Sequence, residues 1–329
     1  MRAFSLEHAE VVSEAIRRKA DNLGSRFIAG GTNLVDLMKE DVARPKLVID
    51  ITRLDLRQIR ERTDGWLALG ALATNAETAD HPQVRQSYPL LREAILSAAS
   101  PQLRNMATNG GNLCQRTRCH YFYDTTLPCN KRSPGSGCGA LHGCNRQHAI
   151  LGASRECVAV HPSDMAVALA ALEARVEIEG LDGQRWLPMA DFHRLPGTTP
   201  QRDNNLEPHE MITAIVLPPR GFSEHWSYIK VRDRRSYAFA LVSVAAGLAF
   251  EGERVAVCRV ALGGVAHKPW RLPEAESLVE GHPPSPSRFR QLADRLLAGA
   301  ELLEHNRFKL ELARRAIVRA LSEAAARKD

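Results

Sequence analysis

Residues 26–39 read RFIAGGTNLVDLMK. A short apolar strand, Arg26–Ala29, leads into a pair of glycines, and Leu34–Lys39 then has the pattern of a helix. Glycines at such a turn let the backbone approach a ligand, and the free N–H groups at a helix start attract phosphate. The stretch is neither G-x-G-x-x-G nor G-x-x-x-x-G-K-[ST], so the usual dinucleotide and P-loop fingerprints are absent. Taken alone, an ordinary turn is the commoner interpretation.

The sequence on both sides of this turn predicts alternating strands and helices. Residues 1–55 read as β-α-β-α-β, with helical spacing over Glu7–Ala20 and an apolar strand at Pro45–Ile51. Farther along, the pattern predicts the strands Trp66–Ala71, Arg175–Glu179 and Met211–Leu217 and the helices Asn75–Asp80, Leu90–Ala99 and Asp164–Leu172. The polar segment Pro196–Glu210 is predicted to be a surface loop.

The composition changes after Pro218-Pro219-Arg220-Gly221. Three strands in succession are predicted at Trp226–Asp233, Ala238–Phe250 and Arg254–Gly263, and residues 289–327 then carry helical periodicity. Strands followed by helices indicate an α+β domain. We therefore predict a domain boundary near residue 221, with an N-terminal subdomain at about 1–55, a second at about 56–221, and a C-terminal domain at 222–329.

Cysteines gather in one loop that has no helix or strand periodicity. Six of the seven fall between Cys114 and Cys157, and only Cys258 lies elsewhere. A large chain that crowds its cysteines in this way resembles a metal or cluster protein more than a disulfide protein. Soft thiolates select zinc, copper(I) or iron–sulfur. No C-x2-C pair occurs, which argues against a zinc finger and equally against the compact cysteine run of ferredoxins.

A second paired-glycine turn, Thr108-Asn109-Gly110-Gly111-Asn112, lies just before this loop, and Ser163-Asp164 opens the helix after it. Each of these features alone is explained by local structure. Together they predict one extended anionic ligand.

Overall composition restricts the class of protein. The charge of +6, from 44 basic and 38 acidic residues, is mild, and no basic tail or aromatic-interleaved basic array occurs, so nucleic-acid binding is disfavoured. No run approaches eighteen apolar residues, so no membrane span is predicted. The N-terminus lacks a secretory signal, which predicts a cytoplasmic protein, or a periplasmic one carried by a signal-bearing partner.

Three motifs, AGGTNLVDLM, TNGGNL and HPSDMAVAL, resemble in order and spacing the FAD-binding subunit of molybdenum hydroxylases, the relatives of xanthine and carbon monoxide dehydrogenases. The inserted cysteine loop, about 113–158, resembles the branch with an additional [4Fe-4S] cluster, most of all the flavin subunit of bacterial periplasmic-type aldehyde oxidoreductases. The resemblance covers the whole chain. It implies an α+β protein in which two α/β subdomains clasp FAD, followed by a C-terminal antiparallel sheet with helices.

The resemblance also implies which residues bind FAD. The first turn would hold the pyrophosphate, the second turn would line the ribityl and ring end, Asp164 would bond the ribityl hydroxyls, and Lys230 would lie near the polar ring edge. The alternatives are a helix-capping role for Asp164 and a solvated strand lysine. The implied residues are Ala29, Gly30, Gly31, Thr32, Asn33, Leu34, Thr108, Gly110, Gly111, Asn112, Asp164 and Lys230.

The implied cluster ligands are Cys119, Cys129, Cys138 and Cys157, spaced C-x9-C-x8-C-x18-C. Cys144 is the rival ligand, since it could replace Cys138 or Cys157.

The other two cysteines, Cys114 and Cys258, are predicted to be buried hydrophobes. Basic residues also crowd the loop, and they either face water or raise the potential of the cluster; they are Arg116, Arg118, Lys131, Arg132 and Arg146.

The function that the resemblance implies is electron transfer within an aldehyde-oxidising enzyme, with no catalytic acid or base in this chain. Its partners would be a large molybdenum-cofactor subunit and a small [2Fe-2S] subunit, in a heterotrimer or a dimer of it, together with an external electron acceptor. Two alternatives remain: a free-standing FAD oxidase with a zinc-stapled loop, and a non-enzymatic scaffold whose metal orders the loop.

Overall fold

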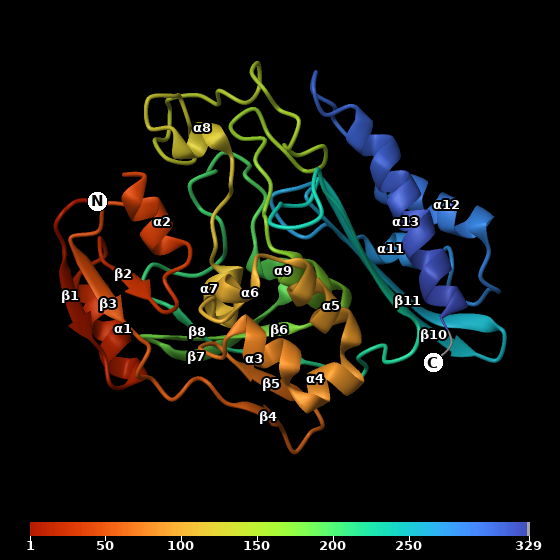
Figure 1. Cartoon of the computed structure of the whole chain (residues 1–329), viewed down its shortest axis with the longest axis horizontal. Coiled ribbons are helices and arrows are strands. Elements are labelled where there is room, and N and C mark those ends of the chain that lie inside the picture. The colour runs from red at the N-terminus through yellow and green to blue at the C-terminus, as the bar shows by residue number, and fades with distance from the viewer. Residues whose placement is uncertain (328–329) are drawn as a thin grey trace.

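The computed structural model of the chain describes residues 1–327 and has three sheets in a row, covered by helices (Figure 1). This mixed α+β architecture confirms the predicted fold class. Within the described residues, no helix is both long and apolar enough to cross a bilayer.

The N-terminal part is a small parallel sheet in the order β1-β3-β2. Its elements are β1 (Ser5–His8), α1 (Val12–Asp21), β2 (Arg26–Ile28), α2 (Leu34–Lys39) and β3 (Leu47–Asp50). The helix predicted over Glu7–Ala20 is wrong at its start, because Glu7 and His8 pair with Ile49 and Asp50 as strand. The strand–turn–helix at 26–39 is confirmed.

The middle part is a five-stranded antiparallel sheet in the order β4-β5-β8-β6-β7. Its strands are β4 (Ile59–Glu61), β5 (Leu67–Gly70), β6 (Arg175–Gly180), β7 (Gly183–Pro188) and β8 (Met211–Leu217). Its helices are α3 (Asn75–Asp80), α4 (Pro82–Ser87), α5 (Pro89–Ser97), α6 (Pro101–Arg104), α7 (Asn109–Leu113), α8 (His120–Tyr123), α9 (Asp164–Ala171) and α10 (Met189–Phe192). Because β5 pairs with β8, the second glycine turn and the cysteine loop, which lie between these strands in the sequence, are held between fixed ends.

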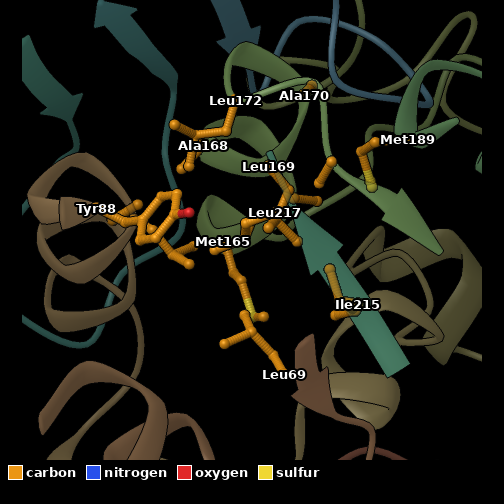
Figure 2. Close-up of a cluster of buried hydrophobic side chains, with 14 of the residues drawn as sticks. Leu69, Tyr88, Met165, Ala168, Leu169, Ala170, Leu172, Met189, Ile215 and Leu217 are labelled. Atoms are coloured by element: carbon orange, nitrogen blue, oxygen red, sulfur yellow. The ribbon is translucent and has the colours of Figure 1, made fainter. Parts of the chain in front are cut away.

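Helix α9 lies at the centre of the main core. All eight of its residues are buried, and Ser163 caps it by accepting a hydrogen bond from the Ala166 N–H at 2.9 Å. Figure 2 shows Met165 reaching from this helix toward Leu69, and Tyr88 to the left of the helix belongs to the same core. The first residue of α9, Asp164, is therefore held rigidly.

The C-terminal part is a three-stranded antiparallel sheet, with β10 between β9 and β11. Its elements are β9 (Trp226–Val231), β10 (Val242–Glu251), β11 (Arg254–Gly263), α11 (Pro273–Glu276), α12 (Pro286–Leu296) and α13 (Phe308–Ala326). The helical periodicity over 289–327 is thus divided between two helices. The break contains Gly299, whose φ of +79° no α-helix accommodates.

Both faces of this sheet are buried, against different partners. Val244 and Ala246 on β10 belong to the core that contains α12 and α13, whereas the intervening Ala245 belongs to the core around α9. The boundary predicted near residue 221 falls between β8 and β9. It stays a prediction, because the sheet beyond it shares a core with the preceding part.

Candidate functional site

The two glycine turns lie against each other. A Cβ atom on Gly30 would lie 1.7 Å from the carbonyl oxygen of Met106, so the first turn touches the backbone that leads into the second. Gly31 has a φ of +70°, in the left-handed region that favours glycine. The N–H of Arg116, beyond the second turn, donates to Oδ1 of Asn33 at 2.9 Å. The structure therefore brings together two segments that the sequence separates by about eighty residues.

Several donors at the first turn have no partner. Within residues 1–327, the backbone N–H groups of Thr32, Asn33 and Leu34 meet no acceptor, and the buried Nδ2 of Asn33 has none either. Unpaired buried donors are rare in native proteins. The turn from Ala29 to Leu34 therefore offers donors for an acceptor-rich ligand.

The second turn is fixed by its own side chains. Thr108 caps α7 by accepting from the Gly111 N–H at 3.3 Å, and a Cβ atom on Gly110 would press on Ala71 at 3.2 Å. Asn112 donates to Oδ1 of Asn75 at 2.8 Å, and its own Oδ1 accepts from the Ser163 hydroxyl. The second turn is thereby joined to the start of α9.

Asn109, which sequence reasoning passed over, is the fully buried anchor of this turn. It donates to Gly70 O at 3.2 Å and to Thr78 Oγ1 at 2.9 Å, and its position within TNGGN was the only sequence indication.

Asp164 and Lys230 form a buried ion pair. Nζ of Lys230 lies 2.8 Å from Oδ2 of Asp164, the hydroxyl of Tyr228 donates to Oδ1 at 2.6 Å, and Lys230 also donates to Ser97 O at 3.0 Å. The solvated-lysine alternative for Lys230 is wrong, because β9 turns this side chain inward onto α9.

Tyr228 was missed from sequence, although its two-residue spacing from Lys230 places both on one face of β9. Burial and the neighbouring Asp164 carboxylate raise the pKa of Tyr228, so its hydroxyl keeps its proton and donates.

An open cavity of about 210 Å³ lies beside this ion pair. Its wall comes from segments 117–120, 144–148 and 160–164 and from the C-terminal sheet, including Ser243 and Gly263. Of the predicted site residues, Asp164 and Cys119 line it, whereas the glycine turns and Lys230 do not. Arg118 also lines it, with its guanidinium 5.3 Å from the centre of the Phe239 ring.

A smaller cysteine cavity adjoins the open cavity. All four predicted ligands line it: Cys119, Cys129, Cys138 and Cys157. The rival Cys144 does not; it is exposed and lines the open cavity. Thr117 and Cys119 line both cavities and form a shared wall. Within residues 1–327, no three His, Cys, Asp or Glu side chains lie close enough together to hold a single metal ion.

The two remaining cysteines differ. Cys258 is fully buried in β11, as predicted, whereas the prediction that Cys114 is buried is wrong. Cys114 follows the last residue of α7 and is exposed there, because the chain leaves the core at this point.

The cysteine cavity is formed by short backbone contacts. Cys129 and Cys138 face each other across an antiparallel bridge. Between them, the Asn130 side chain accepts from the Gly137 N–H at 2.8 Å and donates to Glu156 beside Cys157 at 2.7 Å. Asn130 was missed from sequence, and it links three of the four cysteines.

Hydrogen bonds favour the thiolate form of Cys138. The thiol of Cys157, together with N–H groups of Val158, Ala140 and Leu141, lowers the pKa of Cys138 despite its burial. Donors aimed at a sulfur in this way also stabilise the thiolate of a metal-bound cysteine.

The loop also holds buried charge. Lys131 lines the cysteine cavity and is 3% exposed; its Nζ donates to Asp203 at 2.6 Å and to Pro200 O at 2.7 Å. Arg116 reaches the same carboxylate at 2.6 Å. Burial acts to raise the pKa of Asp203, but these two cations outweigh it and hold that pKa below its usual value. Asp203 belongs to the polar segment that was predicted to be a surface loop.

The other three basic residues of the loop make different contacts. Arg132 donates to backbone carbonyls of its own loop, including Tyr121 O at 2.8 Å, and Arg146 pairs with Asp233 at 2.7 Å. Arg118 has no carboxylate partner within residues 1–327. Only Lys131 is therefore a buried cation at the cysteine cavity, and Arg118 faces the open cavity.

Comparisons with known proteins agree along the whole chain. The family described as "FAD binding domain in molybdopterin dehydrogenase" matches residues 2–220, and "CO dehydrogenase flavoprotein C-terminal domain" matches residues 227–324. The "Aldehyde oxidoreductase FAD-binding subunit PaoB" of Escherichia coli (strain K12) is 49% identical over 328 residues, which cover 99% of each chain. The glyceraldehyde dehydrogenase medium chain of Sulfolobus acidocaldarius is 28% identical over 84% of this chain and 81% of that one.

Solved structures have the same fold. A chain of carbon monoxide dehydrogenase from Hydrogenophaga pseudoflava superposes with a TM-score of 0.77 at 26% identity, covering 99% of this chain and 98% of that one. A chain of quinoline 2-oxidoreductase from Pseudomonas putida 86 gives a TM-score of 0.75 at 24% identity, covering 98% and 97%, which shows the fold alone.

Proposed function

Because the chain belongs to the family of FAD-binding subunits of molybdenum hydroxylases, we propose that it is the FAD- and [4Fe-4S]-binding electron-transfer subunit of a molybdenum-dependent aldehyde oxidoreductase. In this role it passes electrons from a large molybdenum subunit and a small [2Fe-2S] subunit to an external acceptor. The aldehyde specificity rests on the 49% identity to the PaoB subunit over 99% of both chains.

The proposed FAD site combines the glycine turns with the open cavity. Free N–H groups at Thr32, Asn33 and Leu34 and the unpaired Nδ2 of Asn33 suit the pyrophosphate. The open cavity, with Asp164 in its wall, is the place for the ring end. Bound FAD supplies the exchange of electrons with the acceptor, and the protein binds and orients it.

The side chains around the open cavity each have a task in this proposal. Lys230 and Tyr228 hold Asp164 in one orientation, which keeps one wall rigid. Arg118 contributes a positive charge that no carboxylate of the described residues neutralises, and such a charge favours an electron-rich ligand.

The observation that best supports the cluster is that four cysteines, far apart in the sequence, line one small cavity, and that no other cysteine of the chain does. Four thiolates are the ligand set of a [4Fe-4S] cluster. Because Cys119 also lines the open cavity, this arrangement supports electron exchange between the two sites.

Metal, sulfide and flavin analysis of the full chain, purified anaerobically, tests this assignment. We expect about one FAD, four iron and four sulfide per chain. Flavin with stoichiometric zinc and no sulfide would instead support the zinc-stapled oxidase, and a colourless protein would support the scaffold.

Activity tests the subunit role. The isolated, flavin-replete chain should not oxidise aldehydes with an artificial acceptor, because the proposal places the substrate-oxidising centre in the large molybdenum subunit. Turnover should appear when the large and small subunits are added. Robust turnover by the chain alone would contradict the proposal.

A further inference from the structure

His148 contacts the sulfur atom of Cys119, the cysteine that lines both cavities. Its Nε2 lies 3.1 Å from Sγ of Cys119. The side chain lines the open cavity and is 4% exposed. Among the four cysteines of the smaller cavity, Cys119 alone also faces the open one.

We propose that His148 tunes the cluster by donating an N–H···S hydrogen bond to the Cys119 thiolate, which raises the reduction potential of the [4Fe-4S] centre. This inference rests on the proposed function, because it requires that the cluster is bound. His148 is a positioning residue here, since it acts on the metal through a ligand.

The direction of the hydrogen bond follows from the chemistry of the ligand. An iron-bound thiolate has lone pairs and no proton, so the proton in this contact must belong to Nε2 of His148. A donor at the sulfur withdraws electron density and stabilises the more negative, reduced cluster. The bond therefore makes reduction easier.

The backbone that carries the imidazole is held by residues at the start of α13 and just before it. Nζ of the buried Lys309, on α13, donates to His148 O at 2.7 Å, and Asn306 donates to Ala149 O at 3.1 Å. The backbone N–H of His148 donates to Asn145 O at 3.0 Å. These contacts fix the backbone from which the ring reaches Cys119.

The ring has no competing hydrogen bond. Its Nδ1 is buried and has no partner among the described residues. The rings of His120 and Tyr121 lie 6.2 Å away, centre to centre, and provide packing only. Among the described residues, the contact to Cys119 is thus the only hydrogen bond of the ring.

Two substitutions separate donation from packing. His148→Leu removes the donor, whereas the amide of His148→Gln places an N–H near the position of Nε2. His142→Leu is the matched control, because His142 is exposed in the same loop and lines neither cavity.

The experiment is an anaerobic redox titration of each full-length variant, following the cluster by EPR and the flavin by absorbance. We expect a more negative cluster midpoint in His148→Leu and values near wild type in His148→Gln and His142→Leu, with iron content and flavin midpoint unchanged. Loss of iron in His148→Leu, with iron retained in His148→Gln and His142→Leu, would also support hydrogen-bond donation by His148 to Cys119.

Three results are adverse. An unshifted midpoint in an iron-replete Leu variant, or equal effects of Leu and Gln, would overturn the role of His148 while leaving the cluster in place. A wild-type chain without iron and sulfide would instead overturn the proposed cluster itself, and this inference with it.

Discussion

The ammonium group of Lys230 lies 2.8 Å from the carboxylate of Asp164, and each side chain is 4% exposed. The two residues come from β9 and α9, so their ion pair joins the C-terminal sheet to the central core. Two charges are thereby buried beside the open cavity, where each depends on the other.

Breaking this pair should destabilise the chain strongly. Lys230→Met leaves a buried carboxylate with only the Tyr228 hydroxyl, and we expect the free energy of urea unfolding to fall by about 3–5 kcal/mol. The double variant Lys230→Met/Asp164→Asn should recover part of this loss. Arg57→Ala, which breaks an exposed pair with Glu77, is the control and should have little effect. Equal losses in Arg57→Ala and Lys230→Met would contradict the importance of burial.

Gly31→Val should release flavin and leave the cluster bound. Valine is strained at a φ of +70°, and its Cβ would lie 3.2 Å from Val35, which distorts the donors of the first turn. Flavin and iron content of the purified variant report the two cofactors separately. Gly24→Ala is the control, because nothing lies within 4 Å of its added Cβ. Full flavin occupancy in a folded Gly31→Val chain would exclude this role of the turn.

Serine at any of the four cavity cysteines should reduce the iron content and the EPR signal of the cluster. Each of them faces the same cavity, and a hydroxyl is a poor substitute for a soft thiolate. Cys144→Ser and Cys114→Ser should behave as wild type, because both side chains are exposed outside the cavity. Loss of the cluster in Cys144→Ser with a silent Cys138→Ser would transfer the ligand role to Cys144.

Lys309 should make folding stability depend on pH. Burial lowers its pKa to about 7 in the folded chain, whereas the unfolded side chain titrates near 10.5. Between these values the unfolded state binds more protons, so this residue makes stability rise with pH by up to about 1.4 kcal/mol per unit. Below pH 7 both states are protonated and the contribution is constant.

The measurement is the difference in unfolding free energy between wild type and Lys309→Met. Wild type should gain on the variant from pH 7 to pH 9, because only wild type has the buried amine. A difference that stays constant over this range would show that the lysine keeps its ordinary pKa.

Local sequence patterns were sufficient for many of the elements. The strand–turn–helix at 26–39, the helix Asn75–Asp80 and the strand Met211–Leu217 follow from apolar periodicity and capping residues that act within a few positions. The first helix was misplaced at its start, because Glu7 and His8 take their strand conformation from a partner some forty residues away.

The site divides in the same way. The sequence by itself determined the kinds of residue available: two glycine turns, a loop with six cysteines, and a family resemblance that singled out four of them. Only the tertiary structure decided which of them meet. It placed Cys144 outside the cysteine cavity, turned Lys230 inward to Asp164, and set His148 against Cys119. These contacts join residues that are distant in sequence, and they form only when packing of the core and pairing of the strands fix the backbone.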